Sequence, residues 1–254
     1  MIELKNLTLG YEERELLSGV NATLKPASLT ALVGRNGSGK STLLRAIASL
    51  GDIIDGSILI DGVELHRLSA RRLAESVAFV STERVRVSNL TAKEAVALGR
   101  APYTNWLGRL STKDEDIVRR SLEICRMEIF SERRLDSLSD GECQRIMIAR
   151  ALAQETPIIL LDEPTSFLDL PNRYELCSLL KRLSHEEGKC ILFSTHELDI
   201  ALTMADYVAL IETPELHLKP ASEMAESDLL KRLFSHGGYN FEESMQGYRS
   251  RISR

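Results

Sequence analysis

Residues 34–42 have the sequence GRNGSGKST, in which glycines alternate with polar residues around a single lysine. Glycines let successive backbone N–H groups curl around phosphate oxygens, and a helix that begins at such a loop adds a favourable dipole. Lys40 would supply positive charge for the β- and γ-phosphates, and the Ser41 hydroxyl would be a ligand of Mg²⁺. The sequence therefore predicts that this loop binds a nucleoside triphosphate with its magnesium ion. The residues expected to contact it are Gly34, Asn36, Gly37, Ser38, Gly39, Lys40, Ser41 and Thr42.

Two adjacent carboxylates, Asp162 and Glu163, follow the apolar residues 158–161. A buried strand that ends in a carboxylate places it at the carboxyl edge of a parallel sheet, where α/β proteins bind ligands. We expect Asp162 to hold Mg²⁺ through water and Glu163 to polarise the attacking water. Together with the phosphate loop, this pair predicts hydrolysis of the γ-phosphate.

Alternating strands and helices are expected to position these groups. The helix over residues 41–50 would carry Leu43, Leu44 and Ile47 on one face. Pro171 can begin a second helix that Gly188 ends. The segments expected to be strands are residues 2–9, 16–24, 29–33, 57–60, 77–80, 158–161, 190–194 and 207–211. This alternation favours a parallel α/β sheet.

The middle of the chain, residues 84–156, is expected to be mostly helical. Helix-capping boxes are predicted at residues 91–94 (TAKE) and 112–115 (TKDE), each followed by apolar residues at helical spacing. Beyond Glu212 the patterns weaken, and only residues 228–234 indicate a further helix.

The composition is that of an ordinary globular protein and excludes several classes. The 254 residues are 43% hydrophobic and 27% charged, and no apolar stretch approaches the length that spans a bilayer. Residues 1–5 contain no signal-peptide core, so we expect a cytoplasmic chain that reaches a membrane only through partners. The net charge of −5 gives no general attraction to nucleic acid, and no nucleic-acid partner is expected. The four cysteines are widely separated, which argues against a metal or disulfide role.

Residues 138–145 (LSDGECQR) resemble the signature segment of ABC transporter ATPases, usually LSGGQ or LSGGE. Taken alone they form a capping box and predict only a helix start. In that family the signature binds the γ-phosphate of ATP held by the other subunit. The resemblance assigns this role to Ser139 and the Gly141 backbone, with Glu142 beside them. Asp140 departs from the usual glycine, so its side chain is expected to point away from phosphate.

Further family segments follow in order. Residues 166–169 resemble the D-loop, and residues 194–197 resemble the switch segment, in which His196 would contact the γ-phosphate and complete the catalytic set with Lys40 and Glu163. Tyr11 stands where the family places an aromatic ring that stacks on adenine.

One position departs from the family pattern. The family usually has glutamine after a strand such as residues 77–80, and here Thr82 occupies that position with Glu83 beside it. The shorter Thr82 hydroxyl could reach Mg²⁺ only through water, whereas Glu83 has the reach if the loop shifts. The link between permease contact and the active site is expected in this segment.

The resemblance implies an α/β P-loop NTPase (RecA-like) core with an antiparallel β subdomain and a helical signature subdomain. The expected parts are residues 1–83 (core with β subdomain), 84–156 (helical signature subdomain), 157–211 (second part of the core) and 212–254 (C-terminal extension). Two copies would enclose ATP between them as a homodimer. The dimer would lie peripherally at the cytoplasmic face of the inner membrane, beneath transmembrane permease subunits, with a substrate-binding protein as an indirect partner.

Two short segments indicate the branch of the family. Residues 97–102 (ALGRAP) and 168–170 (LDL) resemble importers of iron-siderophore, haem or cobalamin type. The alternatives are an ABC ATPase of another importer or exporter class, a non-transport ABC ATPase, or a module that binds ATP without turnover. Long coiled-coil arms or a second cassette, which ABC ATPases that act on nucleic acid or ribosomes carry, do not occur in this sequence.

Overall fold

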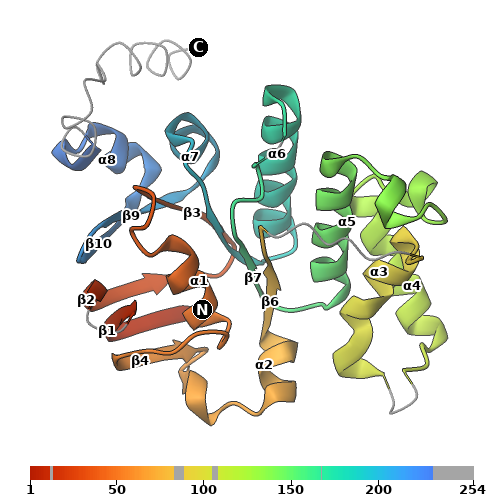
Figure 1. Cartoon of the computed structure of the whole chain (residues 1–254), viewed down its shortest axis with the longest axis horizontal. Coiled ribbons are helices and arrows are strands. Elements are labelled where there is room, and N and C mark those ends of the chain that lie inside the picture. The colour runs from red at the N-terminus through yellow and green to blue at the C-terminus, as the bar shows by residue number, and fades with distance from the viewer. Residues whose placement is uncertain (12–13, 83–88, 105–107, 167, 231–254) are drawn as a thin grey trace.

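The computed structural model describes residues 1–11, 14–82, 89–104, 108–166 and 168–230. Within them the chain forms two β-sheets and a set of helices that pack around the larger sheet (Figure 1). Glu83 and Phe167, which the sequence placed in functional loops, lie outside the described residues, as does everything after residue 230.

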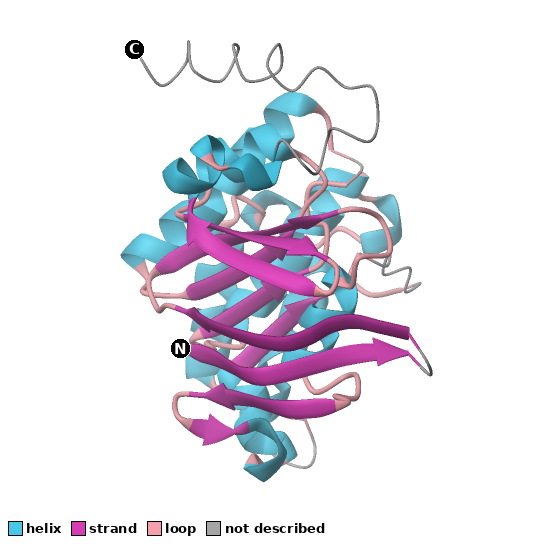
Figure 2. Ribbon diagram, turned by 90° about the vertical axis from the view of Figure 1, so that its left-hand side faces the viewer, coloured by secondary structure: helices cyan, strands magenta, loops and turns pink. Residues whose placement is uncertain are grey.

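The smaller sheet is antiparallel and contains the N-terminal hairpin. Its strands are β1 (Ile2–Tyr11), β2 (Arg14–Leu24), β4 (Asp55–Ile60) and β5 (Val63–Glu64), in the spatial order β2-β1-β4-β5. Leu4, Leu7 and Leu9 of β1 are buried on the face toward the core. This sheet lies beside the larger one (Figure 2), and the Ser18 backbone N–H donates to the Pro214 carbonyl at 2.9 Å between them.

The larger sheet confirms the predicted parallel arrangement. Its strands are β3 (Ser28–Gly34), β6 (Val77–Val80), β7 (Ile158–Leu161), β8 (Cys190–Ser194), β9 (Tyr207–Glu212) and β10 (Glu215–Pro220), in the order β10-β9-β3-β8-β7-β6. Among these strands only β10 runs antiparallel to its neighbour. Strands β3, β7 and β8 are adjacent and parallel, so the segments that follow them meet at one edge of the sheet.

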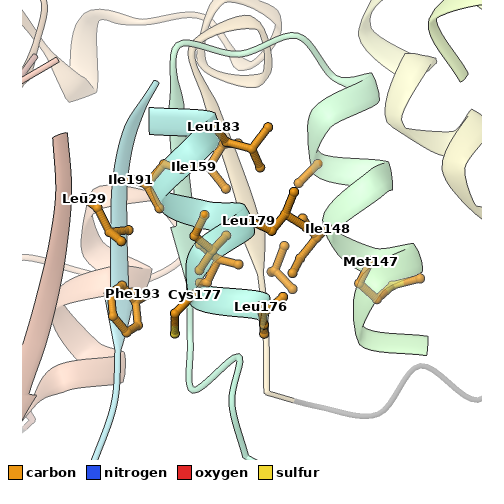
Figure 3. Packing of buried hydrophobic residues seen from close by; sticks show 14 of the residues in the cluster. Leu29, Met147, Ile148, Ile159, Leu176, Cys177, Leu179, Leu183, Ile191 and Phe193 are labelled. Atoms are coloured by element: carbon orange, nitrogen blue, oxygen red, sulfur yellow. The ribbon is translucent and has the colours of Figure 1, made fainter. Parts of the chain in front are cut away.

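Helices cover the parallel sheet and form a separate group on one side. They are α1 (Lys40–Ile47), α2 (Ala70–Ser76), α3 (Ala92–Ala97), α4 (Thr112–Ile124), α5 (Asp140–Ala153), α6 (Leu170–Glu186), α7 (Leu198–Met204) and α8 (Ala221–Glu226). Helices α3, α4 and α5 come between β6 and β7, as expected, and group to one side of the sheet (Figure 1). Figure 3 shows Ile148 of α5 and Leu179 of α6 in the core that joins this group to the sheet. The division into domains at residues 83, 156 and 211 remains our proposal.

Two helix starts were predicted from capping boxes, and the structure confirms one of them at the predicted residues. The box at Thr91 and Glu94 is confirmed, with both reciprocal hydrogen bonds present. The second box was predicted one residue too late, because the cap is Ser111 and the carboxylate three residues on is Asp114. Asp114 is held in this position by a further 2.8 Å bond from the Arg100 Nε atom, a long-range partner that the local pattern does not contain.

Side chains from the 3₁₀ segment Leu98–Tyr103, which follows α3, donate hydrogen bonds to the last carbonyls of α5. The buried Arg100 donates to the Ala153 carbonyl at 2.7 Å, and the Tyr103 hydroxyl donates to the Gln154 carbonyl at 3.0 Å. The Gln154 amide in turn donates to the carbonyls of Ala74 and Val77 at 2.6 and 3.0 Å, between α2 and β6. The C-terminal end of α5 is therefore fixed to the core, since these otherwise orphan groups are paired.

The region after Glu212 contains more structure than the sequence indicated. Strand β10 and helix α8 were not predicted, and β10 is an edge strand of only partly buried residues, which gives weak patterning. Residues 228–230 are helical, and the rest of the helix expected over 228–234 lies outside the described residues. None of the described helices is long and apolar enough to cross a membrane.

Candidate nucleotide-binding and hydrolysis site

The glycine-rich loop connects β3 to α1 and has the geometry that its composition predicts. Gly37 and Gly39 have φ angles of 74° and 105°, in the left-handed region that favours glycine. A Cβ atom at Gly39 would lie 3.2 Å from the Leu16 Cβ atom, so the close approach of the loop to β2 also selects glycine. The positive φ angles at Gly37 and Gly39 keep the backbone of the loop curled at the N-terminus of α1.

The Lys40 ammonium group lies within the loop rather than in solvent. Its Nζ atom donates to the carbonyls of Gly34 and Arg35 at 2.9 and 3.3 Å and lies 3.4 Å from the Nδ1 atom of His196. Burial lowers the pKa of Lys40 from its usual value, and the carboxylates of Glu163 and Asp162 oppose that shift. A phosphate would replace weak neutral acceptors by a full negative charge.

The Ser38 hydroxyl tests whether the loop suits a phosphate. Its Oγ atom is buried and has no hydrogen-bond partner among the described residues. A buried hydroxyl without a partner is costly, so such a group in a native protein calls for an explanation. A nucleotide phosphate in the curl of the loop would supply the acceptor, and we conclude that the loop fits one.

Asp162 lies where the three adjacent parallel strands end. Its Oδ1 atom accepts hydrogen bonds from the Ser41 hydroxyl at 3.0 Å and from the Ser194 hydroxyl at 2.7 Å. Mg²⁺ is usually bound by one or two carboxylates together with phosphate oxygens and water, rather than by an all-protein cage. The pair of Ser41 and Asp162 fits that requirement. No cluster of three or more His, Cys, Asp or Glu side chains suited to a metal occurs within the described ranges.

Glu163 and His196 are brought together from β7 and β8. The His196 Nε2 atom and the Glu163 Oε1 atom are in hydrogen-bond contact. The ammonium group of Lys40 can only donate hydrogen bonds, so the Nδ1 atom of His196 is the acceptor in their contact. In a neutral imidazole the other nitrogen, Nε2, then carries the proton, and this proton faces Glu163. Lys40, His196 and Glu163 thus form a continuous chain from the phosphate loop to a partly exposed carboxylate.

Thr82 lies beside the same carboxylates, but its hydroxyl proton is directed at the backbone. Its Oγ1 atom donates to the Asp162 carbonyl oxygen at 2.9 Å. The expectation that Thr82 reaches Mg²⁺ through water is untested by this geometry and remains a prediction.

Tyr11 is placed at the side of the loop. The residue is 61% exposed, and its hydroxyl lies 2.9 Å from the Thr42 hydroxyl at the start of α1. An exposed ring held beside the phosphate loop is available to a base, and stacking on adenine remains a prediction. Asn36, at the tip of the loop, is exposed.

The signature segment lies apart from the phosphate loop of the same chain. Ser139 caps α5, and both its backbone N–H and its hydroxyl donate to the Glu142 carboxylate, at 2.7 and 2.8 Å. A Cβ atom at Gly141 would lie 3.1 Å from Leu168, so glycine allows close packing there. Figure 1 shows β6, β7 and α6 between α5 and α1. Among the described residues, the site around Lys40 therefore lacks the signature.

A family model described as "ABC transporter" matches residues 17–166. The chain belongs to the ABC transporter family. Among its relatives, an uncharacterized ABC transporter ATP-binding protein of Methanocaldococcus jannaschii is 37% identical, covering 96% of this chain and 84% of the relative. An achromobactin transport ATP-binding protein of Dickeya dadantii and an iron(3+)-hydroxamate import ATP-binding protein of Bacillus subtilis are each 35% identical, covering 92% of this chain and 87% of each relative.

Solved ABC structures have the same fold. A proposed metal-chelate type ABC transporter in an inward-facing conformation matches with a TM-score of 0.81 and 28% identity, covering 92% of this chain and 88% of that one. A dimeric ATP-binding cassette bound to ADP and phosphate matches with a TM-score of 0.75 and 30% identity, covering 87% and 99%. The predicted P-loop NTPase class is confirmed, and the chain is an ATP-binding ATPase cassette of the ABC family.

The sequence placed Ser194 in the switch segment but assigned it no contact of its own. Ser194 ends β8, donates to Asp162 and accepts from the Glu163 backbone N–H at 2.8 Å. The available signal was a polar side chain at the end of a fully buried strand, next to the strand that ends in Asp162.

Proposed function

We propose that this ABC cassette hydrolyses Mg-ATP with Glu163 as the group that polarises water. The observation that carries the proposal is the contact chain from Lys40 through His196 to Glu163, beside the Ser41 and Asp162 pair. Lys40 and the loop N–H groups would hold the β- and γ-phosphates, and Ser41 and Asp162 would hold Mg²⁺. His196 would contact the γ-phosphate, and Tyr11 would stack on adenine. Positioning and preorganised charge are the main sources of acceleration in phosphoryl transfer.

We further propose that two copies form composite sites. Each chain would contribute the phosphate loop, Asp162 and Glu163 to one site, and Ser139, Gly141 and Glu142 to the other. The separation of α5 from α1 within one chain and the dimeric state of the related cassette with bound ADP and phosphate support this arrangement. ATP would hold the dimer closed, and the charge repulsion that follows hydrolysis would loosen it.

We propose that the dimer drives import of a metal chelate through transmembrane permease subunits, with a substrate-binding protein as an indirect partner. Iron-siderophore cargo is favoured over haem and cobalamin, because relatives over more than nine-tenths of this chain are named for achromobactin, petrobactin and iron-hydroxamate transport. The site of action would be the cytoplasmic face of the membrane, where the permease holds the cassette.

Glu163→Gln tests the hydrolytic assignment. The variant keeps size and polarity but loses the base, so it should bind Mg-ATP and hydrolyse it at least about a hundredfold more slowly, a typical contribution of general-base catalysis. It should also elute as a dimer with ATP. Near-normal turnover would refute the role of Glu163.

Uptake by cells that lack the protein tests the cargo. Loss of growth on a ferric siderophore, restored by wild type and not by Lys40→Ala, is the expected result. Unchanged uptake of siderophore, haem and cobalamin, with loss of sugar, peptide or lipid transport, would refute the cargo and leave the ATPase assignment intact.

A further inference from the structure

The peptide bond between Asp162 and Glu163 is held on both sides by side chains from neighbouring strands. Its carbonyl accepts the Thr82 hydroxyl at 2.9 Å, and its N–H donates to the Ser194 hydroxyl at 2.8 Å. Thr82 follows β6 and Ser194 ends β8, so the strands on either side of β7 each supply one contact. Two side chains from other segments, Thr82 and Ser194, therefore fix the orientation of this peptide plane.

Glu163 needs such a constraint because its backbone is in an unfavourable conformation. Its φ angle is 48°, in the left-handed region, which costs a residue with a Cβ atom about 1 kcal/mol or more. Conformations of this kind persist only where surrounding contacts determine them. Rotation of the preceding peptide would relieve the strain and would also move the Glu163 carboxylate away from His196.

The Thr82 hydroxyl continues the hydrogen bonding between β6 and β7 beyond its last backbone contact. That contact joins the Asp162 N–H to the Val80 carbonyl at 2.9 Å. Two residues after Val80, beyond the end of β6, the side chain of Thr82 bonds to the carbonyl of the same Asp162. The short threonine side chain reaches this carbonyl because it lies directly beside the end of β7.

We propose that Thr82 is a positioning residue for ATP hydrolysis. Its hydroxyl fixes the Asp162–Glu163 peptide and thereby aims the Glu163 carboxylate, and this action does not depend on contact with Mg²⁺. The inference rests on the proposed role of Glu163 as the group that polarises water. It assigns a function to the position at which this sequence departs from the family pattern.

Thr82→Val tests the inference, since valine keeps the shape and removes the hydroxyl. Loss of one hydrogen bond of ordinary strength predicts a kcat about five- to tenfold lower, measured as steady-state ATPase activity of the purified full chain. The KM for ATP and the Mg²⁺ concentration for half-maximal activity should stay at wild-type values. Thr82→Ser, which keeps the hydroxyl, should restore kcat to within about twofold of wild type. Ser81→Ala, which removes a neighbouring hydroxyl, is the matched control and should be unchanged.

The outcomes separate this inference from the proposed function. If Glu163→Gln is nearly inactive and Thr82→Val is as active as wild type, the positioning role is wrong and the base assignment stands. If Thr82→Val raises the Mg²⁺ requirement while kcat at saturating Mg²⁺ is normal, Thr82 acts on the metal ion and the inference is overturned. If kcat falls equally in Thr82→Val and Thr82→Ser, the hydroxyl is irrelevant and the inference is again overturned.

Discussion

Replacing Ser38 with alanine should change the stability and the nucleotide affinity of this cassette in opposite directions. The Ser38 Oγ atom is buried without a hydrogen-bond partner among the described residues, so its removal breaks no hydrogen bond between them. The free energy of unfolding without nucleotide should be unchanged or raised by about 1 kcal/mol, because a buried unsatisfied polar group is lost. Ser41→Ala is the matched control. It removes the 3.0 Å bond to Asp162 and should lower the free energy of unfolding by about 1 kcal/mol.

The binding of ATP should respond in the reverse sense. A hydrogen bond to a charged phosphate contributes about 1.5 kcal/mol or more, so Ser38→Ala should raise the Kd by at least about tenfold. With ATP well above both dissociation constants, the stabilisation that the ligand gives should fall by about 1.4 kcal/mol. For a chain of this size, the ATP-dependent rise in Tm should be smaller by about 3–6 °C.

Thermal unfolding with and without ATP, together with titration calorimetry, measures both effects on one sample. The contrary result is a Ser38→Ala variant that is destabilised without ATP and binds ATP as tightly as wild type. The Ser38 hydroxyl would then have a partner within the protein, and the argument that it awaits a phosphate would be wrong.

Two further results are expected. Mixing a Lys40→Ala chain with a Ser139→Arg chain leaves one composite site with both defects and one with neither, so part of the ATPase activity should return. No return despite heterodimer formation would mean that the sites are not composite or that turnover needs both, and ATP trapping in the heterodimer distinguishes these. Hydrogen bonds from Ser111, with Arg100 as a weaker cause, lower the pKa of Asp114 from 3.8 to about 2. Because the folded-state pKa is the lower one, this carboxylate's contribution to stability is present above pH 3.8 and is lost as the pH falls toward 2. The stability difference between wild type and Asp114→Asn, followed by chemical denaturation, should therefore shrink over that interval, and a constant difference would contradict the assignment.

Features set by neighbouring residues could be predicted from the sequence. The phosphate loop requires glycines and one lysine within nine positions, and the positive φ angles of Gly37 and Gly39 agree with that local pattern. The strand that ends in Asp162 could be predicted as well, because an apolar run and a terminal carboxylate lie together in the chain. The cap at Ser139 with Glu142 is equally local.

Features set by contacts between distant segments could not be predicted in this way. The partner of Thr82 depends on the register of β6 against β7, which are about eighty residues apart. The role of Ser194 depends on β8 lying on the other side of β7. Strand β10 was missed because an edge strand buries little and its pattern is correspondingly weak. The choice of Ser111 over its neighbour as a cap involves Arg100, which the local motif does not contain.

Helix α5 is hydrogen-bonded to the core at its C-terminal end, and its N-terminal turn, capped by Ser139, is partly exposed. Its 14 residues give a length of about 21 Å from the C-terminal end at Gln154 to the N-terminal end. A tilt of about 10° around the C-terminal end carries the N-terminal end through about 4 Å, at 1.5 Å of helix per residue. Hydrogen bonds weaken over a few tenths of an ångström, so under the proposed role of Ser139 a rotation this small would be enough to make or break its contact with a phosphate. The Arg100 and Gln154 contacts hold the C-terminal end of the helix, so substitutions there should change its tilt without touching a nucleotide.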